Sequence, residues 1–305
     1  MNGIGIDVSK ATLDVAVHQG GHRSFANTAT GHRKLILWLK TLPVRQVVLE
    51  PTGGYEQDVL DTLHAAGLPV VRANARQVRD FARATGQLAK TDRLDAAVLA
   101  HIAQVLDLPA YQPPAPWQRR LAEHVQSRRQ VVQLLVRAEQ QLRAVKDRAL
   151  RRMLQGNLTQ LRKSKDFLDQ QIAQQVSEQP QLHALQTLKG VGPVLLAVLA
   201  SQLPELGKLD GKAVAKLVGV APLAHDSGTM RGTRRIWGGR ADIRQALYMS
   251  ALSALRHEPR LRDFYQCLRA RGKAAKVAIV AVMRKMLVIL NARARDAGVP
   301  RQAGA

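Results

Sequence analysis

Four acidic side chains stand where a small α/β domain can gather them, and together they predict a divalent-metal site. Asp7 lies inside the strand-like run IGIDVSK, Glu50 ends the run QVVLE, and Asp92 and Asp95 are three residues apart in KTDRLDA. Residues three apart share one face of a helix, and an unpaired carboxylate inside a strand is costly. Carboxylate oxygens suit Mg²⁺ or Mn²⁺, and such ions can assist phosphoryl transfer.

Each acid also has a simpler interpretation. Asp92 can belong to a helix cap, Asp95 can pair with a neighbouring base on the surface, and Asp7 can accept hydrogen bonds from turn amides. For any single acid the two interpretations are balanced, whereas the four acids together favour the metal site. Three further acids lack this context and are expected to be solvated: Asp14, Asp58 and Asp61.

A second candidate is Ser227, in the segment HDSGTMRG. A serine in a basic, flexible loop is accessible to a backbone phosphate, and guanidinium groups can hold that phosphate and stabilise developing charge. Ser227 is therefore a candidate covalent nucleophile, with His225 as a candidate base. On spacing alone, a loop-capping role for this serine is favoured over catalysis. The arginines expected to bind nucleic acid are Arg231, Arg234, Arg235, Arg240 and Arg244.

A glycine turn in LKGVGP opens an apolar helix beginning near residue 193. Backbone N–H groups at a helix N-terminus suit a phosphate without reading bases. The spacing resembles one half of a helix-hairpin-helix element, which makes Lys189, Gly190 and Gly192 candidate nucleic-acid contacts. A helix cap explains the same glycines equally well.

These residues need elements to position them. Residues 3–8, 13–18 and 22–27 read as strands, and a helix over 31–42, a strand over 46–50, a helix over 55–66 and a strand over 68–74 follow. Three antiparallel-looking strands followed by alternating helices and strands form the element order of an α/β RNase H-like domain.

A proline-rich stretch, DLPAYQPPAPW, marks a boundary after this domain. We therefore expect an N-terminal domain over 1–106, a linker over 107–117, a helical coiled-coil hairpin over 118–185 and a mainly α C-terminal domain over 186–305. The hairpin should break near Gly156. Its favoured role is scaffold or dimer contact.

The formal net charge is +23, and nearly all of the excess lies after residue 110. Such an asymmetry favours a nucleic acid gripped by the C-terminal two-thirds of the chain, over a general composition bias toward arginine. Cys267 is the only cysteine, which excludes an intramolecular disulfide framework. The apolar runs are too short to span a bilayer, and no leader pattern precedes the first strand. We expect a cytoplasmic protein.

The motifs together resemble a known family. GIDVSKATLDVAV, VVLEPTGGYE, KTDRLDA, LKGVGP and LVGVAPLAHDSGTMRGTRRIWGGRADIRQALYMSAL occur in the order typical of the Piv-type insertion-sequence transposases, and the resemblance spans essentially the full length. Family members have a RuvC-like domain with a DEDD tetrad and a serine-bearing transposase domain. By motif, the tetrad falls on Asp7, Glu50, Asp92 and Asp95, and the catalytic serine falls on Ser227.

This resemblance implies a recombinase that cleaves and rejoins double-stranded DNA, uses Mg²⁺ (or Mn²⁺) at the tetrad and attaches the DNA covalently to the serine. It also implies a homodimer or homotetramer in which the RuvC-like domain of one subunit faces the transposase domain of another. Some members pair a structured non-coding bridge RNA with both donor and target DNA, whereas others invert a DNA segment. The resemblance shifts Ser227 from loop cap to nucleophile.

Three alternatives remain open at this point. A RuvC-like junction endonuclease would use water as the nucleophile and would leave Ser227 structural. A sugar-kinase or actin-like ATPase shares the opening motif, but no second phosphate loop follows and the basic charge stays unexplained. A packaging protein has no use for a carboxylate cluster. The sequence thus predicts a DNA transposase or site-specific recombinase.

Overall fold

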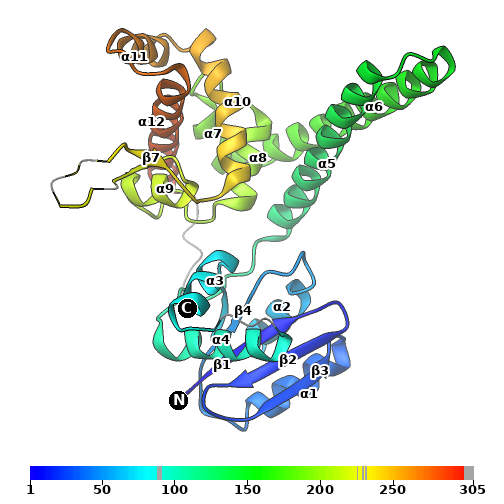
Figure 1. The fold of residues 1–305 in the computed structure, drawn as a ribbon, viewed down its shortest axis with the longest axis vertical. Coiled ribbons are helices and arrows are strands. Elements are labelled where there is room, and N and C mark those ends of the chain that lie inside the picture. Colours follow the sequence, from blue (N-terminus) through cyan, green and yellow to red (C-terminus); the bar gives the residue numbers. More distant parts are fainter. Residues whose placement is uncertain (88–90, 225, 229, 231, 299–305) are drawn as a thin grey trace. The chain divides into compact units, whose positions relative to one another are not determined.

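The computed structural model describes residues 1–87, 91–224, 226–228, 230 and 232–298 (Figure 1). The chain divides into two compact units, Met1–Pro113 and Pro114–Ala305. The division falls inside the proline-rich stretch. Residues before it still belong to the first unit, since Tyr111 is buried and its backbone N–H donates to the carbonyl oxygen of Val70 (2.7 Å).

The first unit is built on a five-stranded sheet with the order β3-β2-β1-β4-β5. β1 (Asn2–Val8), β2 (Thr12–Val17) and β3 (His22–Ala26) form an antiparallel meander, joined by short turns. β4 (Val44–Leu49) pairs in parallel with β1, and β5 (Val70–Arg72) pairs in parallel with β4. Parallel neighbours need a crossover, which α1 (Ala29–Leu39) and α2 (Gln57–Ala65) supply. This mixed sheet is compatible with the predicted RNase H-like domain.

Helices cover both faces of this sheet. Alternate residues of β1 and β2, including Ile4, Ile6 and Leu13, pack with α1 and α2 in one apolar cluster. The opposite face of β4 and β5 packs against α3 (Ala75–Ala84) and α4 (Asp92–Val105) in a second cluster that contains Val48 and Val98. Because side chains alternate along a strand, Gly3, Gly5 and Asp7 lie on the α4 face.

The second unit is mostly helical, as predicted for the C-terminal region. Its core gathers buried residues of the helices over 193–202, 211–218, 241–257 and 275–296, together with the base of a long helical hairpin. The helices and two short paired strands are α5 (Pro116–Ala144), α6 (Arg148–Ser177), α7 (Pro180–Gln186), α8 (Pro193–Gln202), α9 (Gly211–Val218), β6 (Pro222–Leu223), β7 (Arg235–Ile236), α10 (Ala241–His257), α11 (Pro259–Ala270) and α12 (Ala275–Asp296).

The helical hairpin turns at a different place from the one predicted. α5 ends at Ala144 and α6 begins at Arg148, whereas Gly156 lies inside α6. Asp147 caps α6 by accepting the backbone N–H of Leu150 (2.8 Å). A single glycine costs a helix only about 1 kcal/mol, so it does not end a helix that side-chain packing supports. A good N-cap is the stronger signal for a helix start.

Within the described ranges, none of the helices has both the length and the apolar composition that a bilayer crossing requires.

Candidate active site

The position of Asp7 follows from two glycines that precede it in β1. A Cβ atom on Gly3 would lie 2.8 Å from the carbonyl carbon of Ala103, and one on Gly5 would lie 2.7 Å from that of Leu99. The backbone of α4 therefore lies directly on β1, where no side chain other than hydrogen fits. Gly3 contacts α4 near Ala103, and Gly5 contacts it closer to its N-terminus, near Ala96. Asp7 is the next residue on this face of β1 and therefore lies closer still to the N-terminus of α4.

The N-terminal turn of α4 carries the other two aspartates of the predicted tetrad. Thr91 is the N-cap, and its hydroxyl accepts the backbone N–H of Leu94 (3.3 Å). The cap is thus Thr91 itself, and Asp92 and Asp95 are left in the first helical turn. Acidic side chains there are favoured by the helix dipole. Asp92 is exposed and Asp95 is half-buried.

Glu50 reaches the same end of the sheet through the parallel pairing of β4 with β1. Ile6 is the register partner of Leu49, so Glu50 follows at the level of Asp7. Val48 packs against α4, and strand alternation puts Glu50 on that same face. The carboxyl ends of two parallel strands and one helix N-terminus therefore bring the four predicted acids together.

The pKa of Asp7 is raised by this arrangement. Burial, as the largest cause, and the negative charges of Asp92, Asp95, Glu50 and Asp14, in that order, together raise the pKa of its carboxyl from 3.8 to about 6. Desolvation and like charges both disfavour the ionised form. A carboxyl group that lies among four other acids, with a pKa raised toward neutral pH, is typical of a functional site.

Asp14 is a fifth acid at this site, and the sequence-based expectation that it is solvated is wrong. It is the direct cross-strand partner of Asp7 and is half-buried. Directly opposed residues share one face of the sheet. Its carboxylate lies 3.5 Å from Nε2 of His22 on β3. The signal for this pair lay in the hairpin formed by residues 3–8 and 13–18, whose register places the two aspartates opposite each other.

Asp61 is not solvated either. Its carboxylate accepts hydrogen bonds from the hydroxyl of Tyr111 (2.9 Å) and from the side-chain amide of Gln57 (3.2 Å). These bonds tie the end of the first unit to α2, so the role of Asp61 is structural.

The donor set of the four acids suits a hard divalent cation, because it consists of carboxylate oxygens. The described residues contain no group of three or more His, Cys, Asp or Glu side chains close enough to hold a metal ion. The acids nevertheless lie close enough for the charges of Asp92, Asp95 and Glu50 to raise the pKa of Asp7. The residues that would hold the ion are Asp7, Glu50, Asp92 and Asp95.

A buried glutamate holds the loop that follows Glu50. Glu56 is only 1% exposed. Its Oε2 accepts the backbone N–H groups of Thr52 (3.0 Å) and Gly54 (2.9 Å), and its Oε1 accepts from the guanidinium of Arg72 (3.0 Å). Charge-assisted bonds of this kind are strong. The motif VVLEPTGGYE thus contains both a candidate ligand and the residue that fixes its loop.

Asn27 connects the loop that follows β1, which contains Asp7, with the loop that begins at Glu50. Its side-chain amide donates to the carbonyl oxygens of Ser9 (2.9 Å) and Tyr55 (3.2 Å). Its Oδ1 lies 2.8 Å from Nε2 of the buried His32, which fixes the amide orientation. Burial lowers the pKa of His32, so this ring is neutral near pH 7 and donates through Nε2. No sequence pattern pointed to Asn27.

Ser227 lies in the loop between α9 and α10, far along the chain from the acids. It is exposed, and its backbone exchanges hydrogen bonds with that of Met230 (3.1 and 3.0 Å). Asp226 accepts the backbone N–H of Gly232 (3.2 Å) and pairs with Arg234 (2.9 Å). His225 and Arg231 lie outside the described residues.

The remaining candidate arginines differ in their contacts. Arg235 is exposed on β7. Arg240 forms a two-bond ion pair with Glu205 (2.7 and 2.5 Å) and donates to the carbonyl oxygen of Gln202 (2.7 Å). Arg244 donates to the carbonyl oxygen of Gly238 (2.6 Å). Arg240 and Arg244 thus hold the end of the loop against the helical core.

The glycine turn before α8 is shaped by packing. Gly190 has φ +93°, and a Cβ atom there would lie 2.6 Å from the backbone of Ala254 on α10. Gly192 is the N-cap of α8, and a Cβ atom on it would meet nothing within 4 Å. Lys189 is exposed beside this turn. Gly190 is therefore required for helix packing, whereas open space surrounds Gly192.

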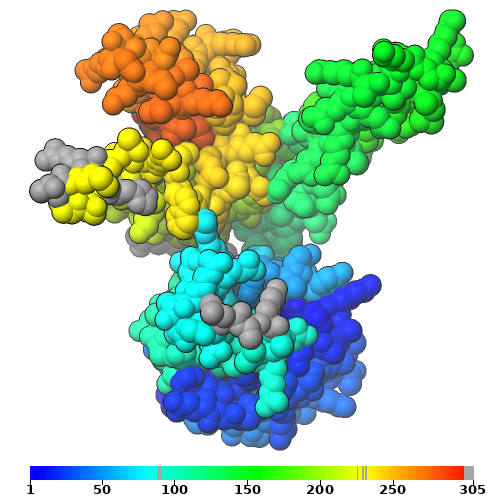
Figure 2. Space-filling model, in the orientation of Figure 1, coloured from blue at the N-terminus to red at the C-terminus, as the bar shows by residue number. Residues whose placement is uncertain are grey.

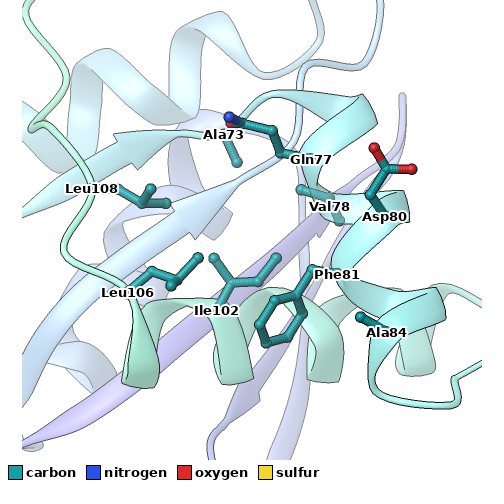
Figure 3. Close-up of a pocket in the computed structure, with 9 residues that line it drawn as sticks. All are labelled: Ala73, Gln77, Val78, Asp80, Phe81, Ala84, Ile102, Leu106 and Leu108. Carbon is teal, nitrogen blue, oxygen red and sulfur yellow. The ribbon is translucent and has the colours of Figure 1, made fainter. Parts of the chain in front are cut away.

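An apolar pocket of about 370 Å³ lies between α3 and α4 in the first unit (Figure 3). Phe81 and Ile102 are among the side chains that line it. Ile102 lies ten residues beyond Asp92 on α4, a distance of about 15 Å along a helix. The pocket is therefore separate from the acids, and its lining offers no catalytic group set.

Comparison with known proteins covers both units. Residues 4–150 match a family model of DEDD transposases of the IS110 type, and residues 182–266 match a model of the IS116/IS110/IS902 transposases. The chain is 26% identical to the pilin gene-inverting proteins of Moraxella bovis and Moraxella lacunata, over 96% of this chain and 95% of each relative.

An insertion element IS110 protein of Streptomyces coelicolor is 29% identical over 47% of this chain and 36% of that protein. The DEDD nuclease-like domain in these matches suggests the use of a divalent metal ion. The matches fall in the same order as the sheet domain with its acids and the helical unit with Ser227. The chain belongs to the IS110/IS116/IS902 family of transposases and is an enzyme that acts on DNA.

Proposed function

We propose that the protein is the recombinase of an insertion sequence, which cleaves and rejoins double-stranded DNA through a covalent serine–DNA intermediate. The observation that carries this proposal is the convergence of Asp7, Glu50, Asp92 and Asp95 at one end of the sheet, in a chain whose second unit matches the same transposase family. A carboxylate cluster of this kind serves phosphoryl transfer.

The acids bind a divalent cation, Mg²⁺ or Mn²⁺, which when present polarises a phosphate oxygen and stabilises the charge of the transition state. Asp7 has a pKa of about 6 and is therefore mostly ionised at neutral pH, as a ligand must be. Asp92 and Asp95 lie on the first turn of α4, whose rigid packing on β1 keeps their spacing fixed.

Ser227 supplies the nucleophile. Its Oγ forms a bond to phosphorus while the bond from phosphorus to a sugar oxygen breaks, the serine proton passes to a base, and the released oxygen gains a proton. In rejoining, the hydroxyl oxygen of another strand end forms a bond to the phosphorus, the bond from phosphorus to the serine Oγ breaks, and the serine regains its proton. Exposure of Ser227, together with the neighbouring guanidiniums of Arg234 and Arg235, supports this role. Guanidinium groups bind phosphate oxygens well.

The decisive experiment compares the wild-type protein with Ser227→Ala on a DNA substrate that traps cleaved ends. The wild-type protein should yield a protein–DNA adduct whose mass maps to the Ser227 peptide, and Ser227→Ala should yield neither adduct nor cleavage. Met230→Ala, in the same loop, is the matched control and should retain both. Cleavage by Ser227→Ala without any adduct would favour a junction endonuclease in which water attacks.

A bridge RNA is the proposed guide, supported by the net charge of +23 and the family membership. The competing function is inversion of a DNA segment without a guide RNA, which the similarity to pilin gene-inverting proteins over 96% of the chain favours. Sequencing the nucleic acid that co-purifies with the protein separates them. A discrete structured RNA from the flank of its own gene supports guidance, whereas DNA alone supports unguided inversion.

We propose further that the active form is a homodimer or homotetramer. The α5–α6 hairpin supports this, because it extends from the core of the second unit in Figure 1 and exposes large apolar side chains. Exposed apolar groups along one element favour association. Those side chains are Leu134, Val136, Leu150, Met153 and Phe167. Replacing Met153 and Phe167 by glutamate should lower the oligomer mass measured by light scattering.

A further inference from the structure

The turn between α11 and α12 carries four positive charges and no acid in the segment RARGKAAK. The four are Arg269, Arg271, Lys273 and Lys276, and all of them are exposed. The acid nearest to them in sequence is Asp263, which lies earlier on α11. We call residues 269–276 the basic turn.

The charges of the basic turn are available to an anionic ligand. Elsewhere in the second unit an arginine can have an acidic partner, as Arg240 has in Glu205. Within the part of the chain that the structure describes, Arg271, Lys273 and Lys276 form no ion pair. Like charges this close repel one another even in water, and a bound polyanion relieves that repulsion.

The backbone of the basic turn is ordered by hydrogen bonds at the end of α11. Gly272 has φ +77° and donates its N–H to the carbonyl oxygen of Arg269 (3.0 Å), and the N–H of Lys273 donates to that of Leu268 (3.1 Å). These two bonds form a Schellman motif, in which glycine is favoured at the left-handed position. The guanidinium of Arg269 also donates to the carbonyl oxygen of Lys273 (2.6 Å). Arg269 therefore braces the turn, and the other three charges are presented on a fixed backbone.

The basic turn and the loop with Ser227 lie on different parts of one helical core. α12 begins in the basic turn, and Val288 further along it contacts the start of α9, where a Cβ atom on Gly211 would lie 3.2 Å from its Cγ1. About 18 Å of helix separates Lys276 from Val288. The end of α9 in turn contacts the loop at Gly238. In Figure 2 the orange atoms of α11 and the start of α12 form an outer corner of the second unit, away from the yellow loop.

The chemistry of the basic turn suits the backbone of a double helix. Lysine and arginine side chains contact phosphates without reading the base sequence. The aromatic side chains of α11, Phe264 and Tyr265, pack against the core of the second unit, so they are not presented as a platform for an unpaired base. A DNA duplex rises about 3.4 Å per base pair, and about 18 Å therefore corresponds to about five base pairs.

We propose that the basic turn binds the phosphate backbone of duplex DNA, about five or more base pairs away from the bond that Ser227 cleaves. This proposal rests on the proposed function, because that function makes DNA the polyanion at the loop with Ser227. Arg271, Lys273 and Lys276 contact the phosphates, and Arg269 positions them by closing the turn. These contacts hold the flanking duplex and add no base specificity.

The first test measures the affinity of the full-length protein for a random DNA duplex of about three helical turns as a function of salt. Each phosphate contact contributes about 0.9 to the slope of log affinity against log salt concentration. The slope of the combined variant should therefore be shallower by about 2 to 3. The combined variant replaces the three phosphate-binding charges: Arg271→Gln, Lys273→Gln and Lys276→Gln.

A matched control makes the same change in net charge at α1, which packs on the sheet face away from α4. It replaces three exposed cations there: Arg33→Gln, Lys34→Gln and Lys40→Gln. The control should keep the wild-type slope. A wild-type slope in the combined variant, or an equal loss of slope in the control, would overturn the proposal.

The second test detects the contact in the wild-type protein, without relying on a variant. Acetylation of Lys273 and Lys276, followed by peptide mass spectrometry, should slow severalfold when the DNA duplex is bound, whereas acetylation of Lys40 should not change. Ser227→Ala should show the same protection, so a failure of the serine mechanism is distinguishable from a failure of this proposal. Undiminished acetylation of both lysines in the DNA complex would contradict the proposal. Stronger protection by an RNA duplex of equal length would assign the basic turn to RNA and contradict it equally.

Discussion

Gly5 of β1 lies against Ala96 of α4 so closely that a Cβ atom on the glycine would overlap the carbonyl oxygen of the alanine. This contact sets the height of α4 on the sheet. Because Asp7 lies two residues beyond Gly5, and Asp92 lies one helical turn before Ala96, the same contact brings the two aspartates together. The acids are therefore positioned by a residue that has no side chain.

Gly5→Ala should displace α4 and separate the acids. Overpacking of this kind typically costs about 1–3 kcal/mol, measurable as a fall in the free energy of unfolding in denaturant titrations. Binding of Mn²⁺ to the DNA-free protein should weaken at the same time. Gly156→Ala is the matched control, since a Cβ atom there meets nothing within 4 Å inside α6. It should stabilise the protein by up to about 1 kcal/mol. A stable Gly5→Ala variant with unchanged Mn²⁺ binding would contradict this account.

The raised pKa of Asp7 predicts the sign of a pH effect on the metal-free protein. Its folded-state pKa is about 6 against 3.8 for a free aspartate, so the folded state binds the proton more tightly than the unfolded state. The stabilisation is complete below about pH 4 and is lost as the pH rises through 6. Asp7→Asn should remove this dependence and should be more stable than the wild-type protein at pH 8. Thermal unfolding across this range, with chelator present, measures it, and parallel curves for the two proteins would refute the prediction.

Asn27→Ala should loosen the loop that follows β1 and the loop that begins at Glu50. The variant loses hydrogen bonds to the carbonyl oxygens of Ser9 and Tyr55, each worth about 1 kcal/mol. We expect a modest fall in stability together with weaker Mn²⁺ binding. Thr62→Ala removes a local bond on α2 (2.6 Å to the carbonyl oxygen of Asp58) and should leave Mn²⁺ binding unchanged. Equal Mn²⁺ affinities in both variants would leave Asn27 with a structural role only.

Substitution of Arg240 should lower stability, whereas substitution of Arg235 should weaken DNA binding. Arg240 forms two bonds with Glu205, so Arg240→Ala and Glu205→Ala should each lower the melting temperature. Their double mutant should show a coupling of about 1 kcal/mol. Arg235→Ala should leave the melting temperature unchanged, weaken DNA binding and reduce the salt dependence of binding by about one ion. A normal melting temperature for Arg240→Ala would contradict the structural role of that ion pair.

The sequence indicated the acids and the strands, but it did not determine which side chains meet across them. Asp7 and Glu50 could be singled out because a carboxylate inside an apolar strand, or directly after one, is unusual. Asp14 was missed because facing residues in a hairpin depend on the register, which a period of two does not specify. Asn27 was missed because one polar residue in a turn carries no pattern. The break expected at Gly156 was wrong because Asp147 supplies a cap and side-chain packing carries α6 through the glycine.

We propose that Asp7, Glu50, Asp92 and Asp95 together form one site that binds a divalent metal ion. The most direct test of this claim is Mn²⁺ binding to the DNA-free protein, followed by the electron paramagnetic resonance signal of the free ion. The wild-type protein should bind Mn²⁺, and Asp7→Asn, Glu50→Gln, Asp92→Asn and Asp95→Asn should each bind at least about tenfold more weakly. Asp107→Asn makes the same change in net charge at the far end of α4, where Asp107 pairs with Arg45 (2.6 Å), and should bind like the wild-type protein. Wild-type affinity in the Asp7→Asn variant would contradict the claim.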